Sequence, residues 1–333
     1  MRRIIGVILA VLGVLLIATA VLLPTWVLGQ LKKFPLDEHQ SATLVATNAS
    51  YFSQKVLKPR TGVTIQATYT ITGNPGKGSS STAVWSQLSN VTDVTNHELI
   101  QQMTRTFAFD RRTGQLVQCC GESINGKPAR QSGYSGAVFP FGTKKQAYDV
   151  FDTTLLRPVP FVYSGTTSVN GIQVYEFTEN VAPTPVATLK IPGALIGQKA
   201  ALLTMSEVDQ IHLVDYVDPV TGALLNVNEH QTVTLRDPAT GATAAVLYDA
   251  DLIATPATVA NTTALDSSGR DELTLVTTIL PIVFGIAGAA LLVGGIFLAR
   301  PRRGPHATAE ADAAVPEMAS SAAEAPEVEA PEA

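Results

Sequence analysis

Hydrophobic residues form two long runs, one near each end of the chain. Residues 4–23 are apolar almost throughout, and residues 273–298 contain no charged residue. A helix needs about 20 apolar residues to cross a bilayer core of roughly 30 Å. The two runs therefore predict two transmembrane helices.

Arginines beside these runs predict their orientation. An Arg-Arg pair precedes the first run, and "RPRR", residues 300–303, follows the second. Arginine is retained on the cytoplasmic side of a span. We therefore expect residues 1–3 and 299–333 in the cytoplasm, and residues 25–272 as the extracytoplasmic domain of a two-pass plasma-membrane protein.

Two features of the apolar runs allow more than one interpretation. "ATA" at 18–20 resembles a signal-peptide cleavage site, but the run continues past it to residue 23, which favours a retained helix. Small residues four positions apart would let the helices pack closely, although such residues are common in membrane helices. These pairs are Gly6 with Ala10, Gly285 with Ala289, and Ala290 with Gly294.

Between the two runs, apolar and polar positions alternate with a period of two. In "GVTIQATYTIT", residues 62–72, every second residue is apolar and most of the others are threonine. "ALLNVNEHQTVTL", residues 223–235, alternates less cleanly, with Leu225, Val227, Val233 and Leu235 on one side. Period two is typical of a strand with one buried and one hydrated face.

Turn sequences separate the predicted strands. The pattern D-x-x-T-G occurs at 110–114, 218–222 and 237–241, and Asn-Gly pairs occur at 125–126 and 170–171. Asp begins type I turns, Gly accepts the left-handed conformation that ends them, and Asn-Gly favours tight hairpins. Five such signals predict an antiparallel sheet.

Helices are expected to be few in this central domain. A short apolar helix is predicted within residues 191–208, and a partly helical segment within 255–272 leads into the second span. The predicted fold class is α+β and β-rich: a curved antiparallel sheet with few helices, flanked by two transmembrane helices.

Composition separates the C-terminal tail from the rest of the chain. Residues 304–333 hold six glutamates, one aspartate and no Lys or Arg, in an Ala/Glu/Pro-rich sequence that predicts disorder. The other 21 acidic residues nearly balance the 23 basic ones. The domain therefore gives no electrostatic indication of nucleic-acid binding.

Candidate chemistry is sparse. Cys119 and Cys120 are the only cysteines, and a vicinal disulfide, free thiols and a disulfide to a partner all remain open, with a redox role as a further possibility. Five histidines are scattered without metal-ligand spacing, and no catalytic motif occurs. Asp149 with Asp152 could act as acid and base, but exposed turn carboxylates are commoner. We predict no enzyme activity, no cofactor and no metal.

Four segments resemble a known family. "FPFGTKKQAYDVFD" (139–152), "FVYSGTTSVNGIQVYEF" (161–177), "IPGALIGQ" (191–198) and "DYVDPVTGALLNVNEHQTV" (215–233) are similar to the actinobacterial porin PorA family, a domain of unknown function. The resemblance supplies no catalytic residues. A pore barrel needs a lipid-facing apolar band, whereas the strands here are rich in threonine, so we predict that the chain is not a β-barrel pore.

The predicted function is binding of a cell-envelope lipid or lipid-linked glycan, because a curved sheet beside a membrane can enclose an apolar cavity. The alternatives are a non-catalytic scaffold for envelope-assembly proteins and, more weakly, an envelope enzyme. Expected partners are membrane lipids and, for the scaffold, those proteins. An ordinary aromatic core is the alternative for most of the candidate ligand-binding residues. These residues are Phe139, Phe141, Lys144, Lys145, Tyr148, Phe151, Phe161 and Tyr163.

Overall fold

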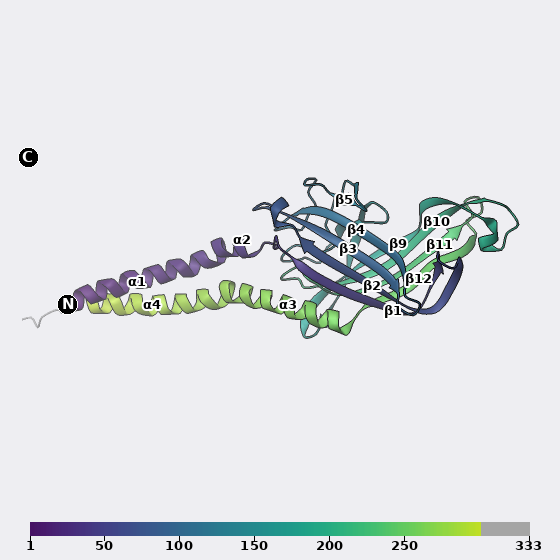
Figure 1. Ribbon diagram of the computed structural model, residues 1–333. Coiled ribbons are helices and arrows are strands. Elements are labelled where there is room, and N and C mark those ends of the chain that lie inside the picture. The colour runs from purple at the N-terminus through teal and green to yellow at the C-terminus, as the bar shows by residue number, and fades with distance from the viewer. Residues whose placement is uncertain (301–333) are drawn as a thin grey trace, which may run out of the picture.

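A long sheet lies at one end of a stalk, which is formed by helices α1 (Arg2–Leu22) and α4 (Leu280–Ala299) (Figure 1). The computed structural model describes residues 1–300, except for the side chains at positions 26–28 and 30. The tail predicted to be disordered lies outside the described residues.

Twelve strands form one sheet in which every neighbouring pair is antiparallel, so the predicted β-rich fold is confirmed. The spatial order is β6-β5-β4-β3-β2-β1-β12-β11-β10-β9-β8-β7, so that only the β1–β12 contact joins strands distant in sequence. The strands are β1 (His39–Ser53), β2 (Lys58–Gly73), β3 (Thr82–Asp93), β4 (Glu98–Asp110), β5 (Ser123–Ile124), β6 (Lys127–Pro128), β7 (Tyr148–Asp152), β8 (Arg157–Val169), β9 (Ile172–Ile191), β10 (Leu203–Val217), β11 (Leu224–Arg236) and β12 (Thr243–Ala254).

The segment between β4 and β7 closes this sheet into a barrel. Leu116 pairs with Phe109 of β4, Gln115 pairs with Tyr134, and Tyr134 pairs with Val150 of β7. These bridges connect the two sides of the curved sheet, which would otherwise remain open edges.

The turns form as their sequences predict. Gly114, Gly222 and Gly241, which end the three D-x-x-T-G motifs, have φ values of 72°, 76° and 72°. Asn125 and Asn170 also have positive φ, as the first residue of a tight hairpin turn requires. Along β2 the predicted alternation holds, because Val63, Ile65 and Ala67 are buried.

The helix predicted within 191–208 is wrong. Only Gly193–Ile196 forms a single 3-10 turn, and β10 begins at Leu203. Gly197 has a φ of 72°, which stops the turn from continuing as a helix. The polar and apolar alternation of Thr204, Met205 and the residues after them then extends the chain into a strand.

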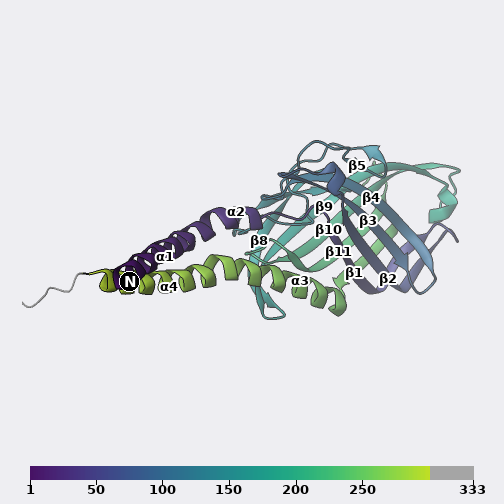
Figure 2. The same ribbon diagram turned by 60° about the vertical axis from the view of Figure 1, so that its left-hand side comes forward.

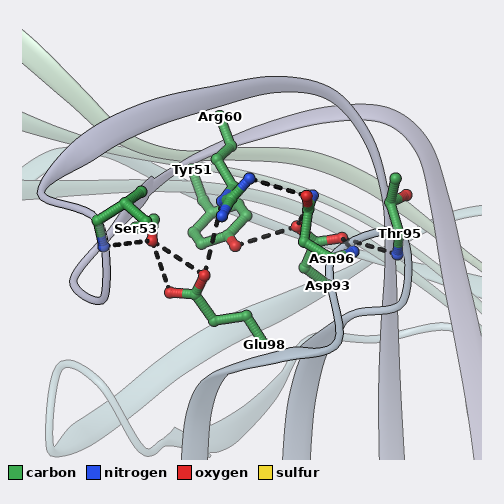
Figure 3. A network of polar contacts seen from close by, with 8 residues as sticks. Tyr51, Ser53, Arg60, Asp93, Thr95, Asn96 and Glu98 are labelled. Atoms are coloured by element: carbon green, nitrogen blue, oxygen red, sulfur yellow. Dashed lines mark hydrogen bonds and ion pairs between the residues drawn. The ribbon is translucent and has the colours of Figure 1, made fainter.

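A buried polar network ties two hairpins together (Figure 3). It lies at the end of the barrel away from the stalk (Figure 1). We call it the distal clasp. The Asp93 carboxylate accepts hydrogen bonds from Tyr51 Oη (3.0 Å), Asn96 Nδ2 (2.7 Å) and the backbone N–H of Thr95 (2.8 Å). The Ser53 hydroxyl donates to Glu98 Oε1 over 2.7 Å. The clasp thereby joins the β1–β2 and β3–β4 turns.

Helix α3 (Pro256–Thr274) lies against the opposite end of the barrel (Figures 1 and 2). Arg270 Nη1 pairs with the fully buried Asp218 over 2.6 Å, and the Thr221 hydroxyl donates to Asp266. Thr262 Oγ1 donates to the backbone carbonyl of Leu225 over 2.8 Å. The 218–222 turn therefore anchors α3 directly to the barrel. The helical segment predicted within residues 255–272 is confirmed by α3.

Two described helices are long and apolar enough to cross a membrane, Arg2–Thr25 and Pro256–Ala299. The first contains α1 (Arg2–Leu22) and the second continues from α3 into α4 (Leu280–Ala299), each interrupted by a π-helical segment, Leu23–Val27 and Leu275–Ile279 respectively. Helices α1 and α4 pack on each other through faces that contain glycine. The apolar side chains of Val11, Leu15 and Ile286 are more than half exposed.

Close helix contact is observed, but partly through other residues than predicted. A Cβ on Gly295 would lie 2.5 Å from the backbone N of Ala10 and 2.6 Å from the carbonyl O of Gly6. Gly285 and Gly294 face open space instead. The contacting glycines are spaced seven residues apart, Gly288 and Gly295 on α4, which keeps them on one helix face.

Leucine at Gly295 is expected to weaken the α1–α4 contact by about 2 kcal/mol, because the added side chain must push two backbones apart. The matched control is Gly294→Leu, whose side chain meets no neighbour within 4 Å. Thermal unfolding of the full chain in detergent, followed by helical circular dichroism, measures both. Equal losses in the two variants would contradict the glycine contact.

Candidate functional site

The barrel encloses a cavity of about 760 Å³. Its lining extends from inward positions of the strands, such as Met103 and Ile211, to Leu265 and Gly269 of α3. Among the described residues, seven acidic side chains line the cavity against two basic ones. The cavity is therefore a continuous, acid-rich space that reaches the helix leading into the stalk.

Three of these acidic residues lie on the neighbouring strands β9, β10 and β11. Leu213 of β10 is paired with Glu179 of β9 on one side and with Glu229 of β11 on the other. Asp215 lies two residues further along β10 and therefore on the same face. We call four of the lining residues, Asp152, Glu179, Asp215 and Glu229, together with the nearby buried Asp209, the carboxylate cluster.

Burial raises the pKa of these carboxyls. For Glu179 burial, followed by the charges of Asp152, Asp215 and Glu229, raises the pKa to about 8. For Glu229 burial and the charge of Asp209 raise the pKa to about 7. Burial likewise raises the pKa of Asp209 to about 6 and that of Asp215 well above its ordinary value. The cluster is consequently part protonated near neutral pH.

Arg105 of β4 is the one basic residue deep in the lining among the residues described. It is 4% exposed, and its Nε donates to Gln131 over 2.7 Å while Nη1 donates to the carbonyl of Ser135 over 2.8 Å. Its guanidinium lies 4.4 Å from the centre of the Phe107 ring. Burial lowers its pKa to about 10, and the charge of Asp152 opposes that shift. Arg105 therefore remains charged and fixes the segment that closes the barrel.

The predicted ligand-binding residues are divided between the core and the cavity wall. Phe139, Tyr148 and Phe161 pack around Phe177 in one buried cluster. Phe141 stacks on Phe34 at 4.7 Å between ring centres. Phe141, Phe151 and Phe161 also line the cavity, whereas Phe139, Tyr148, Tyr163, Lys144 and Lys145 do not.

The two lysines lie on the outside of the barrel. Lys144 and Lys145 are exposed, and Lys145 Nζ lies 5.2 Å from the ring centre of Tyr163 and 5.1 Å from that of Tyr175. Phe139 instead holds the 218–222 turn, because its backbone N–H donates to the carbonyl of Gly222 over 2.9 Å. The "FPFG" run thus forms scaffold around that turn.

Cys119 and Cys120 form a vicinal disulfide in an exposed turn. Cys120 has a φ of 68°. This bond is one of the alternatives that the sequence left open, and a redox role stays a prediction. Within residues 1–300, no group of three or more His, Cys, Asp or Glu side chains could hold a metal ion.

Sequence reasoning missed the carboxylate cluster. A signal was present in β11, where Glu229 and Gln231 occupy inward positions between Val227 and Val233. A charged residue in the apolar phase of a strand indicates a buried polar site rather than a solvated face.

One curated relative shares a short segment with this chain. It is a protein called Porin PorA from Corynebacterium resistens (strain DSM 45100 / JCM 12819 / GTC 2026 / SICGH 158), 42% identical over 45 residues. The aligned segment covers 14% of this chain and 11% of the relative.

A family model described as Porin PorA matches residues 5–297, nearly the whole chain. Porins are channel proteins, so this match contradicts the predicted lipid- or glycan-binding function and the scaffold, and it gives no support to the enzyme alternative. The family and the two apolar helices also indicate a membrane protein. By this match the chain belongs to the porin PorA family.

Proposed function

We propose that the protein is a channel subunit in which α1 and α4 cross the membrane and the barrel forms a vestibule for small hydrophilic cations. The observation that carries this proposal is the acid-rich cavity, enclosed by a closed barrel and continuous with α3 beside the helical stalk. Membership of a porin family supports a channel function.

The surface of the molecule favours helices rather than strands as the membrane-crossing part. The outer positions of β2 include Thr64, Gln66 and Thr68, which do not provide the apolar band of a membrane barrel. The stalk instead presents exposed apolar side chains such as Leu15 and Phe297. The arginines that precede α1 and follow α4 support an orientation in which both termini lie in the cytoplasm and residues 25–272 lie outside it.

The charge of the cavity favours cations. Carboxylates around a confined space with low-dielectric walls raise the local cation concentration and repel anions. The pair of helices encloses no aqueous path of its own, because glycine contacts bring the two backbones together. Several copies of the chain are therefore needed to surround the conducting path. In this proposal the protein acts without enzyme chemistry and without a cofactor.

Purified full-length chain in planar bilayers is expected to give discrete current steps, with a reversal potential in a KCl gradient that favours K⁺. Glu229→Gln removes a cavity charge and should shift that reversal potential toward zero. Asp251→Asn is the control, because Asp251 lies on the outer face of β12 and is 76% exposed. Absence of steps above a detergent blank would contradict the channel.

The proposed orientation has a separate test. A cysteine introduced at the exposed Lys144 is expected to react with a membrane-impermeant maleimide in intact cells. The parent chain, whose two cysteines are joined to each other, gives the background. Labelling that appears only after lysis would place the barrel in the cytoplasm and overturn the topology.

A further inference from the structure

A pair of carboxylates faces the cavity with one leucine between them. Glu179, Leu213 and Glu229 form a row across β9, β10 and β11. Two strand spacings separate the glutamates, so their backbones are roughly 10 Å apart. The concave side of the barrel turns both side chains toward the same space.

Glu179 has a buried carboxylate oxygen that lacks a hydrogen-bond donor among the described residues. It is 4% exposed, it lines the cavity, and its Oε1 has no hydrogen-bond partner among the residues described. A buried carboxylate oxygen without a donor is unfavourable, whereas a bound ammonium would supply that donor and a compensating charge. Asp215, on the same face, is also 4% exposed and lines the same cavity.

The surface between the two glutamates suits an alkyl chain. Leu213 lies between them in the row, and Ile211 lines the cavity two residues earlier on β10. Tyr69 and Tyr248 line the cavity near Glu229, and aromatic faces attract ammonium groups. Oxygen ligands spaced in this way do not form the compact shell that a metal ion requires.

We propose that the Glu179–Leu213–Glu229 row binds a short aliphatic diamine. One ammonium pairs with Glu179 and Asp215, the other pairs with Glu229, and the methylene chain packs on Leu213. The idea that this diamine passes through the vestibule rests on the proposed channel function. Binding itself requires only the closed barrel.

Binding is expected to release protons at pH 7. Burial, with the charges of Asp152, Asp215 and Glu229, holds the pKa of Glu179 at about 8, so the free cavity retains a proton there that an ammonium displaces. The charged and titratable groups around the row are Asp152 of β7, Asp209 and Asp215 of β10, Glu229 of β11, Tyr69 of β2, Tyr248 of β12 and Arg105 of β4.

Calorimetric titration of the full chain in detergent with α,ω-diaminoalkanes and matching monoamines tests the site. Affinity should peak at roughly four to six carbons, the length that spans the row, and each monoamine should bind at least tenfold more weakly. Measurements in two buffers of different ionisation enthalpy should reveal proton release. Equal affinity for all chain lengths, or no binding, would overturn the proposal.

Variants separate the site from the fold. Glu179→Gln and Glu229→Gln should each weaken diamine binding at least tenfold, and Glu179→Gln should also abolish most of the proton release. Asp251→Asn, on the outer face, should bind like the parent chain. Unchanged affinity in Glu179→Gln overturns the assignment. Diamine binding without bilayer current would reject the channel function and retain the diamine site. Bilayer current without diamine binding would retain the channel function and reject the diamine site.

Discussion

Alanine at Asp93 is expected to lower the free energy of unfolding by about 3 kcal/mol. Asp93 is fully buried in the distal clasp, where it accepts hydrogen bonds from Tyr51, Thr95 and Asn96. Removing the carboxylate leaves several donors unpaired at the junction of two hairpins, each at a cost of about 1 kcal/mol. The loss should appear as earlier thermal unfolding, reported by the fluorescence of the buried Trp85.

A second turn aspartate provides the matched control. Asp237 accepts from the backbone N–H groups of Ala239 and Thr240 in the exposed 237–241 turn, and both of these bonds lie within the turn itself. Asp237→Ala should therefore cost about 1 kcal/mol or less. If both alanine variants lose the same stability, the clasp adds nothing beyond local turn formation.

Acid should weaken the clasp as well. Burial alone would raise the pKa of Asp93, but hydrogen bonds from Asn96, Tyr51 and Thr95 outweigh it and hold the pKa below its ordinary value. The stabilising contribution is therefore present above pH 4 or so and is lost as the pH falls through the lowered pKa. Asp93→Ala should reduce the acid sensitivity of unfolding.

Glutamine at Glu179 is expected to stabilise the protein at pH 9 by about 3 kcal/mol and to change little at pH 5. Burial, with the neighbouring carboxylates, raises the pKa of Glu179 to about 8. The protonated carboxyl of Glu179 favours the folded state. This contribution is complete below the pKa that Glu179 has in the unfolded chain, and it is lost as the pH rises to about 8. Above that pH the parent chain carries a buried, unpaired charge that glutamine lacks.

Melting temperatures measured from pH 5 to pH 9 check this result. The parent chain should become less stable as the pH rises from 5 to about 8 and should level off above that, and the Glu179→Gln profile should be flatter. Asp251→Asn removes an acidic group that is 76% exposed and pairs with the half-exposed His230 across 2.7 Å, so it should change the slope much less than Glu179→Gln does. A parallel profile for Glu179→Gln would show that Glu179 titrates like an exposed carboxyl.

Local sequence signals predicted much of the fold. Alternation in β2 and the D-x-x-T-G turns depend on neighbouring residues, so they are readable without tertiary information. The segment 191–208 failed because its apolar composition fits either a helix or a buried strand, and the pairing of β10 with β9 and β11 decided between them.

The site could not be predicted in the same way. Glu179 and Glu229 are 50 positions apart, and only the register of β9, β10 and β11 brings them to either side of Leu213. The aromatic residues were easier to notice, but Phe139 and Tyr148 pack on one another instead of facing the cavity. Burial and register, rather than residue type, separate a core residue from a ligand contact.

The pairing of β1 with β12 has a consequence for biogenesis. Leu44 is paired with Ala254, so this seam joins the first and last strands of the barrel. In the proposed orientation, α1 would enter the membrane before most strands are translocated, and the seam can form only after β12 has been synthesised. The entropy lost in closing so long a loop makes this a slow step. A chain stalled in export would therefore present β1 as an unpaired edge open to aggregation.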